Sequence, residues 1–171
     1  GVKVWTNTVI TKHNVDRLDF ILNMGKELDF WSTFQPVLEY SHSTDSNEIA
    51  TLAFDIEKYQ AAIDLLVDRK RNGANVIHSK SYLEYVRNPN WAENKRKCYA
   101  GELYCAVKPN GEVSPCYPEF NERKWPNGLE LGFSEAFRQS NLNSCRGCYC
   151  MIVESDFTYS LNPTAIANTL N

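Results

Sequence analysis

The stretch that decides the fold is the cysteine-rich part of the chain. It contains Cys98-Tyr-Ala-Gly101, then Val107-Lys-Pro-Asn-Gly-Glu-Val-Ser-Pro-Cys116, and then Cys145-Arg-Gly-Cys148. The 171 residues include 6 cysteines, all of which lie after residue 97. From residue 91 onward the chain is also rich in Gly, Pro and Tyr and poor in long apolar periods. We therefore expect a small domain over residues 91–171 that is organised around its cysteines.

A β-hairpin is predicted between Cys98 and Cys116. Residues 102–108 and 112–116 are strand-like, and Pro109-Asn110-Gly111 between them is typical of a tight turn in which Asn-Gly supplies positive φ. Because a hairpin folds back on itself, its two ends can lie side by side. The two cysteines at those ends can then serve one site.

Cys145-Arg-Gly-Cys148 is a tight pair whose spacing lets two thiolates bind one metal centre, and Gly147 allows the backbone to turn between them. The predicted metal ligands are therefore Cys98, Cys116, Cys145 and Cys148. Four thiolates suit a [4Fe–4S] cluster, and they equally suit a structural zinc ion. Structural zinc sites more often use two tight pairs, whereas this set has one. From the spacing alone, both metals stay open.

Two cysteines and three histidines remain outside this ligand set. Cys105 alternates with Leu103 and Val107 on one face of the predicted hairpin, which predicts a small buried residue. Cys150 follows Cys148 closely and could compete with it as a ligand. The histidines lie far apart in the sequence, so structural or surface roles are expected for all of them: His13, His42 and His78.

The first half of the chain has the alternating pattern of an α/β protein. Strands are predicted over residues 2–11 and 30–38, and the intervening helix is expected to begin at a cap formed by Asn14. Further along come a helix over 55–72, a short extended Val76-Ile77-His78 and a helical segment over 79–86. This order favours parallel strands with helices packed on a face. Two such strands are too few by themselves, so residues 1–90 are expected to end a larger barrel or sheet.

Two short helices are predicted in the second half, over residues 134–140 and 162–170.

The composition limits which classes of molecule the chain is expected to bind. The formal net charge is −3 and no Lys/Arg run stands out, so nucleic acid is not an expected partner. The apolar stretches are too short for a membrane span, and no signal-peptide pattern precedes the first strand. A reducing, cytoplasmic location is therefore expected, in which thiolates bind metal and do not form disulfides.

The cysteine half resembles the auxiliary-cluster domain of radical S-adenosylmethionine enzymes, of the SPASM type or its one-cluster "twitch" form. The likeness lies in Cys98-Tyr-Ala-Gly101, in residues 107–116, in Leu131-Gly-Phe-Ser-Glu-Ala-Phe137 and in Cys145-Arg-Gly-Cys148. Asn7-Thr-Val-Ile-Thr-Lys-His-Asn14 and Phe34-Gln-Pro36 resemble the fifth and sixth barrel strands. Residues 70–83 are similar to the segment that joins the barrel to the cluster domain.

This resemblance implies an α/β fold in which the last strands and helices of a partial (β/α)6 barrel, residues 1–90, precede a small cysteine-rich hairpin-and-helix domain, residues 91–171. It implies one [4Fe–4S] cluster and a parent oxidoreductase or maturase that acts on a small-molecule or peptide substrate. The chain departs from the family in one respect. The C-x3-C-x2-C motif of the catalytic cluster does not occur among the 6 cysteines.

By the same resemblance, we expect the first four barrel strands, which carry the turns that bind S-adenosylmethionine, to lie outside this chain. We expect S-adenosylmethionine to bind only in a full-length parent that includes the missing N-terminal barrel half. This chain alone is expected to be inactive. The alternative from another functional class is a non-enzymatic, structural zinc-binding module that folds on its metal.

Overall fold

The structure is a computed structural model that describes residues 2–37, 55–88, 98–117 and 123–141. These residues form two compact units, the first from 2–37 and 55–88 and the second from 98–117 and 123–141. Residues 89–97, where the sequence predicts the domain boundary, lie outside the described residues. The predicted helix at 162–170 lies outside them too.

The first unit is built on a parallel sheet. Strand β1 (Val4–Ile10) pairs in parallel with β2 (Phe30–Pro36), in the register Val4↔Phe30 to Ile10↔Pro36. A single parallel bridge joins Ser32 of β2 to Val76. The Ser32 N–H donates to the Asn75 carbonyl at 2.9 Å, and the Ile77 N–H donates to the Ser32 carbonyl at 3.0 Å. The predicted parallel pairing of the two strands is therefore confirmed.

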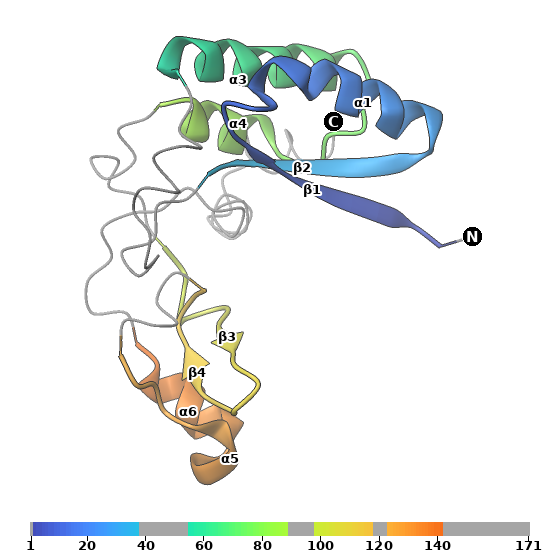
Figure 1. Ribbon diagram of the computed structural model, residues 1–171. Helices are drawn as coiled ribbons and strands as arrows, with labels where there is room; N and C mark the ends of the chain where they lie inside the picture. The colour runs from blue at the N-terminus through green and yellow to red at the C-terminus, as the bar shows by residue number, and fades with distance from the viewer. Residues whose placement is uncertain (1, 38–54, 89–97, 118–122, 142–171) are drawn as a thin grey trace. The chain divides into compact units, whose positions relative to one another are not determined.

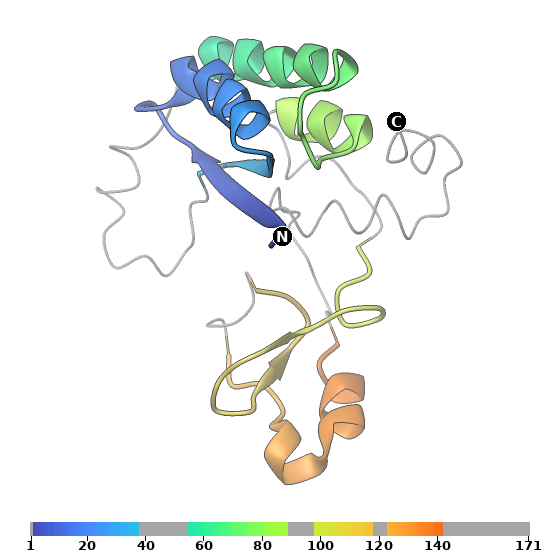
Figure 2. The same cartoon turned by 90° about the vertical axis from the view of Figure 1, so that its right-hand side faces the viewer.

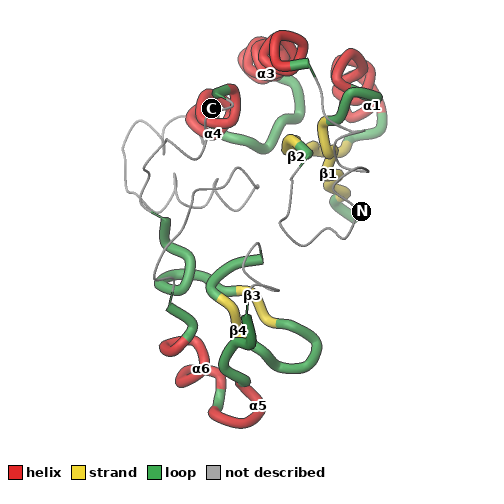
Figure 3. Tube along the Cα trace, turned by 60° about the vertical axis from the view of Figure 1, so that its left-hand side comes forward, coloured by secondary structure: helices red, strands yellow, loops and turns green. Residues whose placement is uncertain are grey.

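The helices of this unit lie on one face of that sheet (Figures 1 and 3). They are α1 (Leu18–Glu27), α3 (Ile56–Arg71) and α4 (Lys80–Arg87), and a 3-10 turn, η1 (Val15–Arg17), leads into α1. The Asp55 side chain caps α3 by accepting from the Lys58 N–H at 3.1 Å. The Ser79 hydroxyl caps α4 by accepting from the Tyr82 N–H at 3.1 Å. Helices are thus found in the three segments where the sequence predicts them.

A continuous apolar core fills the space between sheet and helices. Tyr59, Ile63 and Leu66, which the sequence places along one line of the predicted helix, are fully buried. Burying side chains of this size stabilises a fold by about 1.5–3 kcal/mol each. The core residues are Ile10, Val15, Leu18, Leu22, Phe34, Tyr59, Ala62, Ile63, Leu66, Val76, Tyr82, Leu83 and Val86.

The helix-free face of the sheet carries a mixed set of side chains. Trp5 and Trp31 are partners in the register and both are exposed. Beside them, the Thr33 hydroxyl donates to the Asn7 side-chain oxygen at 3.1 Å. The sheets of the described part are small, and none closes into a barrel. The partial barrel therefore stays a prediction.

One predicted cap is wrong. Asn14 precedes η1 but makes no side-chain capping bond to it. Its side chain turns back to the end of β1 instead, where it accepts from the Thr11 N–H and donates to the Val9 carbonyl, both at 2.8 Å. Asparagine satisfies nearby backbone groups equally well in a turn and at a helix start, and here the turn after the strand uses it.

The second unit combines a short hairpin with two short helices (Figure 2). Strands β3 (Ala106–Val107) and β4 (Val113–Ser114) pair antiparallel, so the predicted hairpin is confirmed, although it is shorter than predicted. Helix α6 (Phe133–Gln139) matches the prediction for 134–140, whereas α5 (Gly128–Leu131) was not predicted. Within the described residues, no helix is both long enough and apolar enough to cross a membrane.

The interior of the second unit is small. Most of its buried residues have small side chains, and Trp125 is the largest of them among the described residues. A core of this size removes little apolar surface from water, so hydrophobic burial stabilises this unit much less than the first. The buried residues in the described part of this unit are Ala100, Val113, Ser114, Pro115, Cys116, Trp125, Ala136 and Ser140.

Candidate metal centre

The hairpin turn depends on a single glycine. The Gly111 N–H donates to the Lys108 carbonyl and the Lys108 N–H donates to the Glu112 carbonyl, both at 2.9 Å, which closes a three-residue loop. Gly111 has φ of 87°, whereas Asn110 has no positive φ. The prediction that Asn-Gly supplies positive φ is therefore right for Gly111 alone. A Cβ on Gly111 would lie 2.6 Å from Cγ of Leu129, so close packing also requires glycine here.

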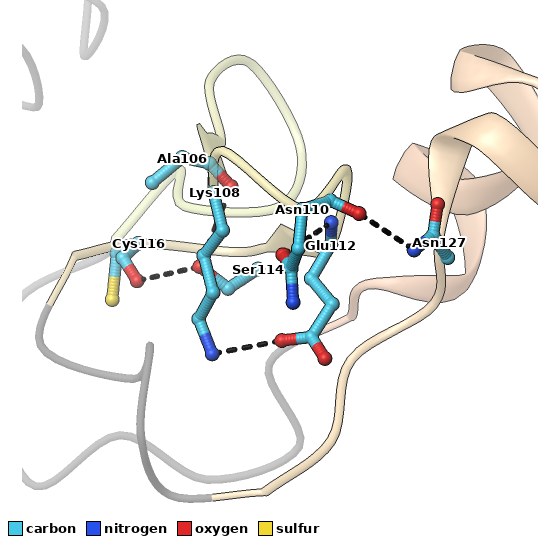
Figure 4. Close-up of polar contacts among 7 residues, drawn as sticks. All are labelled: Ala106, Lys108, Asn110, Glu112, Ser114, Cys116 and Asn127. Atoms are coloured by element: carbon cyan, nitrogen blue, oxygen red, sulfur yellow. Dashed lines mark hydrogen bonds and ion pairs between the residues drawn. The ribbon is translucent and has the colours of Figure 1, made fainter.

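An ion pair braces the same turn (Figure 4). Lys108 Nζ lies 2.8 Å from Glu112 Oε2, and the side chains are only 20% and 12% exposed. The Glu112 N–H also donates to the Asn110 side-chain oxygen at 3.2 Å. The hydrogen bond from Lys108 is the main cause that lowers the pKa of Glu112, and the positive charges of Lys108 and Lys124 add to it against the opposing effect of burial. Glu112 is therefore ionised at neutral pH.

The backbone of Cys116 is fixed by the hairpin. The buried Ser114 hydroxyl lies 3.0 Å from the Cys116 carbonyl oxygen and 3.4 Å from the Ala106 carbonyl oxygen. Cys116 itself is 9% exposed. Figure 4 shows its sulfur pointing away from the hydrogen bonds that are drawn for the hairpin. The position of this predicted ligand is therefore fixed through its main-chain carbonyl group.

Cys98 begins a tight turn over residues 98–104, which we call the Cys98 turn. The N–H groups of Glu102 and Leu103 donate to the Tyr99 carbonyl at 3.0 and 2.9 Å. The Gly101 N–H donates to the Tyr104 carbonyl at 2.8 Å, which closes the turn. Within the turn the Tyr104 hydroxyl lies 3.6 Å from the half-buried Cys98 sulfur.

The Cys98 turn packs directly against two other parts of the second unit. Gly101 has φ of 77°, and a Cβ there would lie 2.8 Å from the Ser140 carbonyl oxygen, 3.2 Å from Cβ of Pro115 and 3.7 Å from Cα of Asn141. Pro115 immediately precedes Cys116, and Asn141 lies four residues before Cys145. Four residues span at most about 14 Å. The segments that carry Cys98 and Cys116 and the segment that leads to Cys145 therefore meet at Gly101.

The path toward Cys145 is anchored to the hairpin by backbone hydrogen bonds. The Val113 N–H donates to the Pro126 carbonyl, and the Gly128 N–H donates to the Gly111 carbonyl, both at 2.8 Å. The Asn127 side chain donates to the Asn110 carbonyl at 2.9 Å and accepts from the Leu129 N–H at 2.8 Å, which starts α5 (Figure 4). These contacts fix where α5 begins relative to the hairpin.

The prediction that Cys105 is a small buried residue on one hairpin face is wrong. Leu103 and Val107, the other residues of that face, are 55% and 54% exposed, and Cys105 is only half-buried. The pairing of β3 and β4 covers two residues on each strand, which is too short to give the hairpin a buried face of its own. Partial burial raises the pKa of the Cys105 thiol. A raised pKa disfavours the thiolate that binds metals.

The described residues contain only part of the predicted ligand set. Cys98 and Cys116 both lie in the second unit, whereas Cys145, Cys148 and the competing Cys150 lie outside the described residues. In the described part, no three His, Cys, Asp or Glu side chains gather into a group that could hold a metal ion. Cys105 thus does not complete a three-ligand group with Cys98 and Cys116. The other two predicted ligands lie within residues 142–171.

The histidines differ in role. Nε2 of His78 accepts a hydrogen bond from the Phe34 N–H at 2.7 Å, and the buried ring stacks on Tyr82 with 4.1 Å between ring centroids. The structural role predicted for His78 is therefore confirmed. His13 is exposed, as expected of a surface residue, and His42 lies outside the described residues.

Sequence reasoning missed one residue beside the candidate centre, Tyr104. The sequence places Tyr104 six residues after Cys98 and beyond Gly101, which suggests a turn between them. Only the closed Cys98 turn of the structure shows that the hydroxyl contacts the sulfur.

Comparison with known proteins adds no assignment, since no protein family, no curated protein and no solved structure matches this chain.

Proposed function

We propose that this chain binds one [4Fe–4S] cluster through Cys98, Cys116, Cys145 and Cys148, as the auxiliary-cluster part of a radical S-adenosylmethionine oxidoreductase or maturase. The meeting of three segments at Gly101 is the observation that supports this most. It brings the turn that begins at Cys98 and the residue before Cys116 together with the chain that leads to the tight cysteine pair.

The residues present fit a thiolate-bound cluster. Cys116 is mostly buried, and the backbone on each side of the hairpin is fixed by hydrogen bonds, so one ligand is shielded from solvent and held in place. Cys98 lies beside a hydroxyl group that can donate to its sulfur. The small core of the second unit is also what a metal-dependent fold requires, because ligand binding then supplies free energy of folding.

When bound, a [4Fe–4S] cluster supplies one-electron transfer. In the proposed parent enzyme, a cluster held by Cys98, Cys116, Cys145 and Cys148 would supply electron transfer to or from a substrate radical, or this domain would help to hold a small-molecule or peptide substrate. The protein's own contribution is to bind the cluster through four thiolates and to exclude water from the side of Cys116. Because the sequence lacks C-x3-C-x2-C, this chain incubated with S-adenosylmethionine and a strong reductant is expected to release no 5′-deoxyadenosine.

A structural zinc site is the second candidate function, and the same small core supports it. Four thiolates including one C-x2-C pair are sufficient for tetrahedral zinc. In that case the chain is a non-enzymatic binding module whose second unit folds on its metal. The two candidates differ in the metal bound, in colour and in redox activity.

Metal analysis of anaerobically purified protein separates the two candidates. The cluster proposal predicts about four irons and about four sulfides per chain, with a broad brown absorption band. Cys98→Ser and Cys116→Ser should each abolish most of that absorption, while the matched control Cys105→Ser should retain it. One colourless zinc per chain would support the second function instead. Protein that retains neither metal would exclude both.

A further inference from the structure

The hydroxyl of Tyr104 lies against a predicted cluster ligand, and this contact has a consequence for the chemistry of the centre. We infer that Tyr104 donates a hydrogen bond to the Cys98 thiolate and thereby raises the reduction potential of the bound cluster. The inference rests on the proposed function, because it requires Cys98 to bind iron. It adds a residue outside the thiolate set that tunes the cluster without binding it.

The direction of the hydrogen bond follows from the chemistry of a bound thiolate. The Tyr104 oxygen and the Cys98 sulfur are 3.6 Å apart, and in the metal-free thiol either atom could donate the proton. A thiolate that binds iron carries no proton, so it can only accept. The phenol then becomes the donor. Sulfur is a large and diffuse acceptor, and 3.6 Å falls within the range of an O–H···S contact.

The backbone holds the two side chains in this arrangement. Cys98 and Tyr104 are the first and last residues of the Cys98 turn, which the Gly101 N–H closes by donating to the Tyr104 carbonyl at 2.8 Å. Ala100 and Tyr104 also form a β-bridge, and Ala100 is buried. The contact between hydroxyl and sulfur is partly buried as well. Water competes less for such a contact than for one on an open surface, which strengthens it.

A hydrogen bond to a ligand sulfur changes the redox equilibrium because the two oxidation states differ in charge. Reduction adds one electron to the cluster and increases the negative charge on its sulfurs. A donor aimed at one of those sulfurs stabilises the reduced state more than the oxidised state. Removing the donor should therefore make the cluster harder to reduce. Iron binding itself should persist, because all four thiolates remain.

A redox titration followed by electron paramagnetic resonance tests this inference on the full chain. Tyr104→Phe removes only the hydroxyl. Tyr117→Phe is the matched control, because it makes the same change on an exposed side chain next to another predicted ligand, Cys116. We expect all three proteins to hold equal iron and the midpoint potential to fall in Tyr104→Phe only. Equal midpoint potentials in wild type and Tyr104→Phe, at equal iron content, would overturn the inference while leaving the cluster proposal intact.

A second measurement does not depend on how well the variant folds. Wild-type protein is prepared with tyrosine labelled with ¹⁷O in its hydroxyl, and the reduced cluster is examined by electron–nuclear double resonance. Because the label enters all 9 tyrosines, a ¹⁷O coupling to the cluster that Tyr117→Phe retains is expected, and the absence of any coupling in wild type would overturn the inference even if Tyr104→Phe loads poorly. Iron analysis of the wild type comes first. Wild-type protein without iron and sulfide would contradict the proposed function, and the role of Tyr104 would fall with it.

Discussion

Gly101 approaches the end of α6 so closely that a Cβ at this position would lie 2.8 Å from the carbonyl oxygen of Ser140. The two residues are far apart in the sequence, yet they join the turn that starts at Cys98 to the helix that leads toward Cys145. Because the obstacle is a backbone carbonyl, it cannot move aside as a flexible side chain can. This contact makes the geometry of the candidate centre sensitive to one methyl group.

Gly101→Ala should therefore weaken both the second unit and its metal site. The positive φ of 77° costs an L-residue about 1–2 kcal/mol, and the collision with Ser140 adds about 1–3 kcal/mol. Gly73→Ala is the control, since Gly73 has φ of 84° and open space around it and lies in the first unit. Hydrogen exchange and iron content measure the outcome. Equal protection and equal iron in the two variants would show that the contact between Gly101 and Ser140 does not matter.

The ion pair at the hairpin turn should make the second unit sensitive to acid. Lys108 lowers the pKa of Glu112 in the folded state, so the pair stabilises the fold above the ordinary glutamate pKa of about 4.5. This stabilisation is lost as the pH falls below that value and through the lower folded pKa. In Lys108→Met, Glu112 should titrate at a higher pH than in wild type. Carboxyl-carbon NMR measures this directly, and unchanged titration of Glu112 would show that the pair is not formed in solution.

His78 should be necessary for the stability of the first unit. In His78→Ala the Phe34 N–H loses its acceptor in a buried position, which costs about 1–3 kcal/mol. The stacking on Tyr82 is lost as well. Urea unfolding of His78→Ala should show a lower midpoint, whereas His13→Ala, at an exposed position, should match wild type. A His78→Ala midpoint equal to that of wild type would contradict the structural role.

Removal of metal should affect the two units differently. The second unit has a small interior, so its hairpin is expected to lose protection when the metal is chelated. The first unit has a large apolar core, so α3 and β2 should keep theirs. Hydrogen exchange gives the comparison at the N–H groups of Lys108, Val113 and Gly128, whose bonds close the hairpin turn and join residues 126–128 to it. If these amides were equally protected with and without metal, the cysteines would not be what stabilises this unit.

Regular elements of the first unit could be predicted because their signals are local. Asp55 and Ser79 cap helices in which the apolar spacing is clear, a β-branched run gives β1, and a second apolar run gives β2. Asn14 could not be assigned from the sequence. Its side chain can either cap a helix or form hydrogen bonds at the end of a strand, and the tertiary structure determines which of the two occurs.

In the second unit, local patterns predicted the hairpin and α6 but not the details of the candidate centre. Cys105 is partly exposed because only two residues on each strand of the hairpin are paired. The alternation of residues in the sequence does not reveal how long the pairing is. The approach of Gly101 to Ser140 is a contact between distant segments, and no spacing reveals it. The contact of Tyr104 with Cys98 required the closed turn. The sequence is sufficient to predict cysteines as the ligands, whereas the contacts around them depend on tertiary packing.

The convergence of four sulfurs on one cluster is the central claim. A crystal structure of the anaerobically purified protein, with diffraction recorded at the iron absorption edge, tests it most directly. The account predicts one anomalous peak from an iron cluster whose irons are bonded to the sulfurs of Cys98, Cys116, Cys145 and Cys148. Iron that is bound without Cys98, or a Cys98 sulfur far from the Cys145–Cys148 pair, would contradict it.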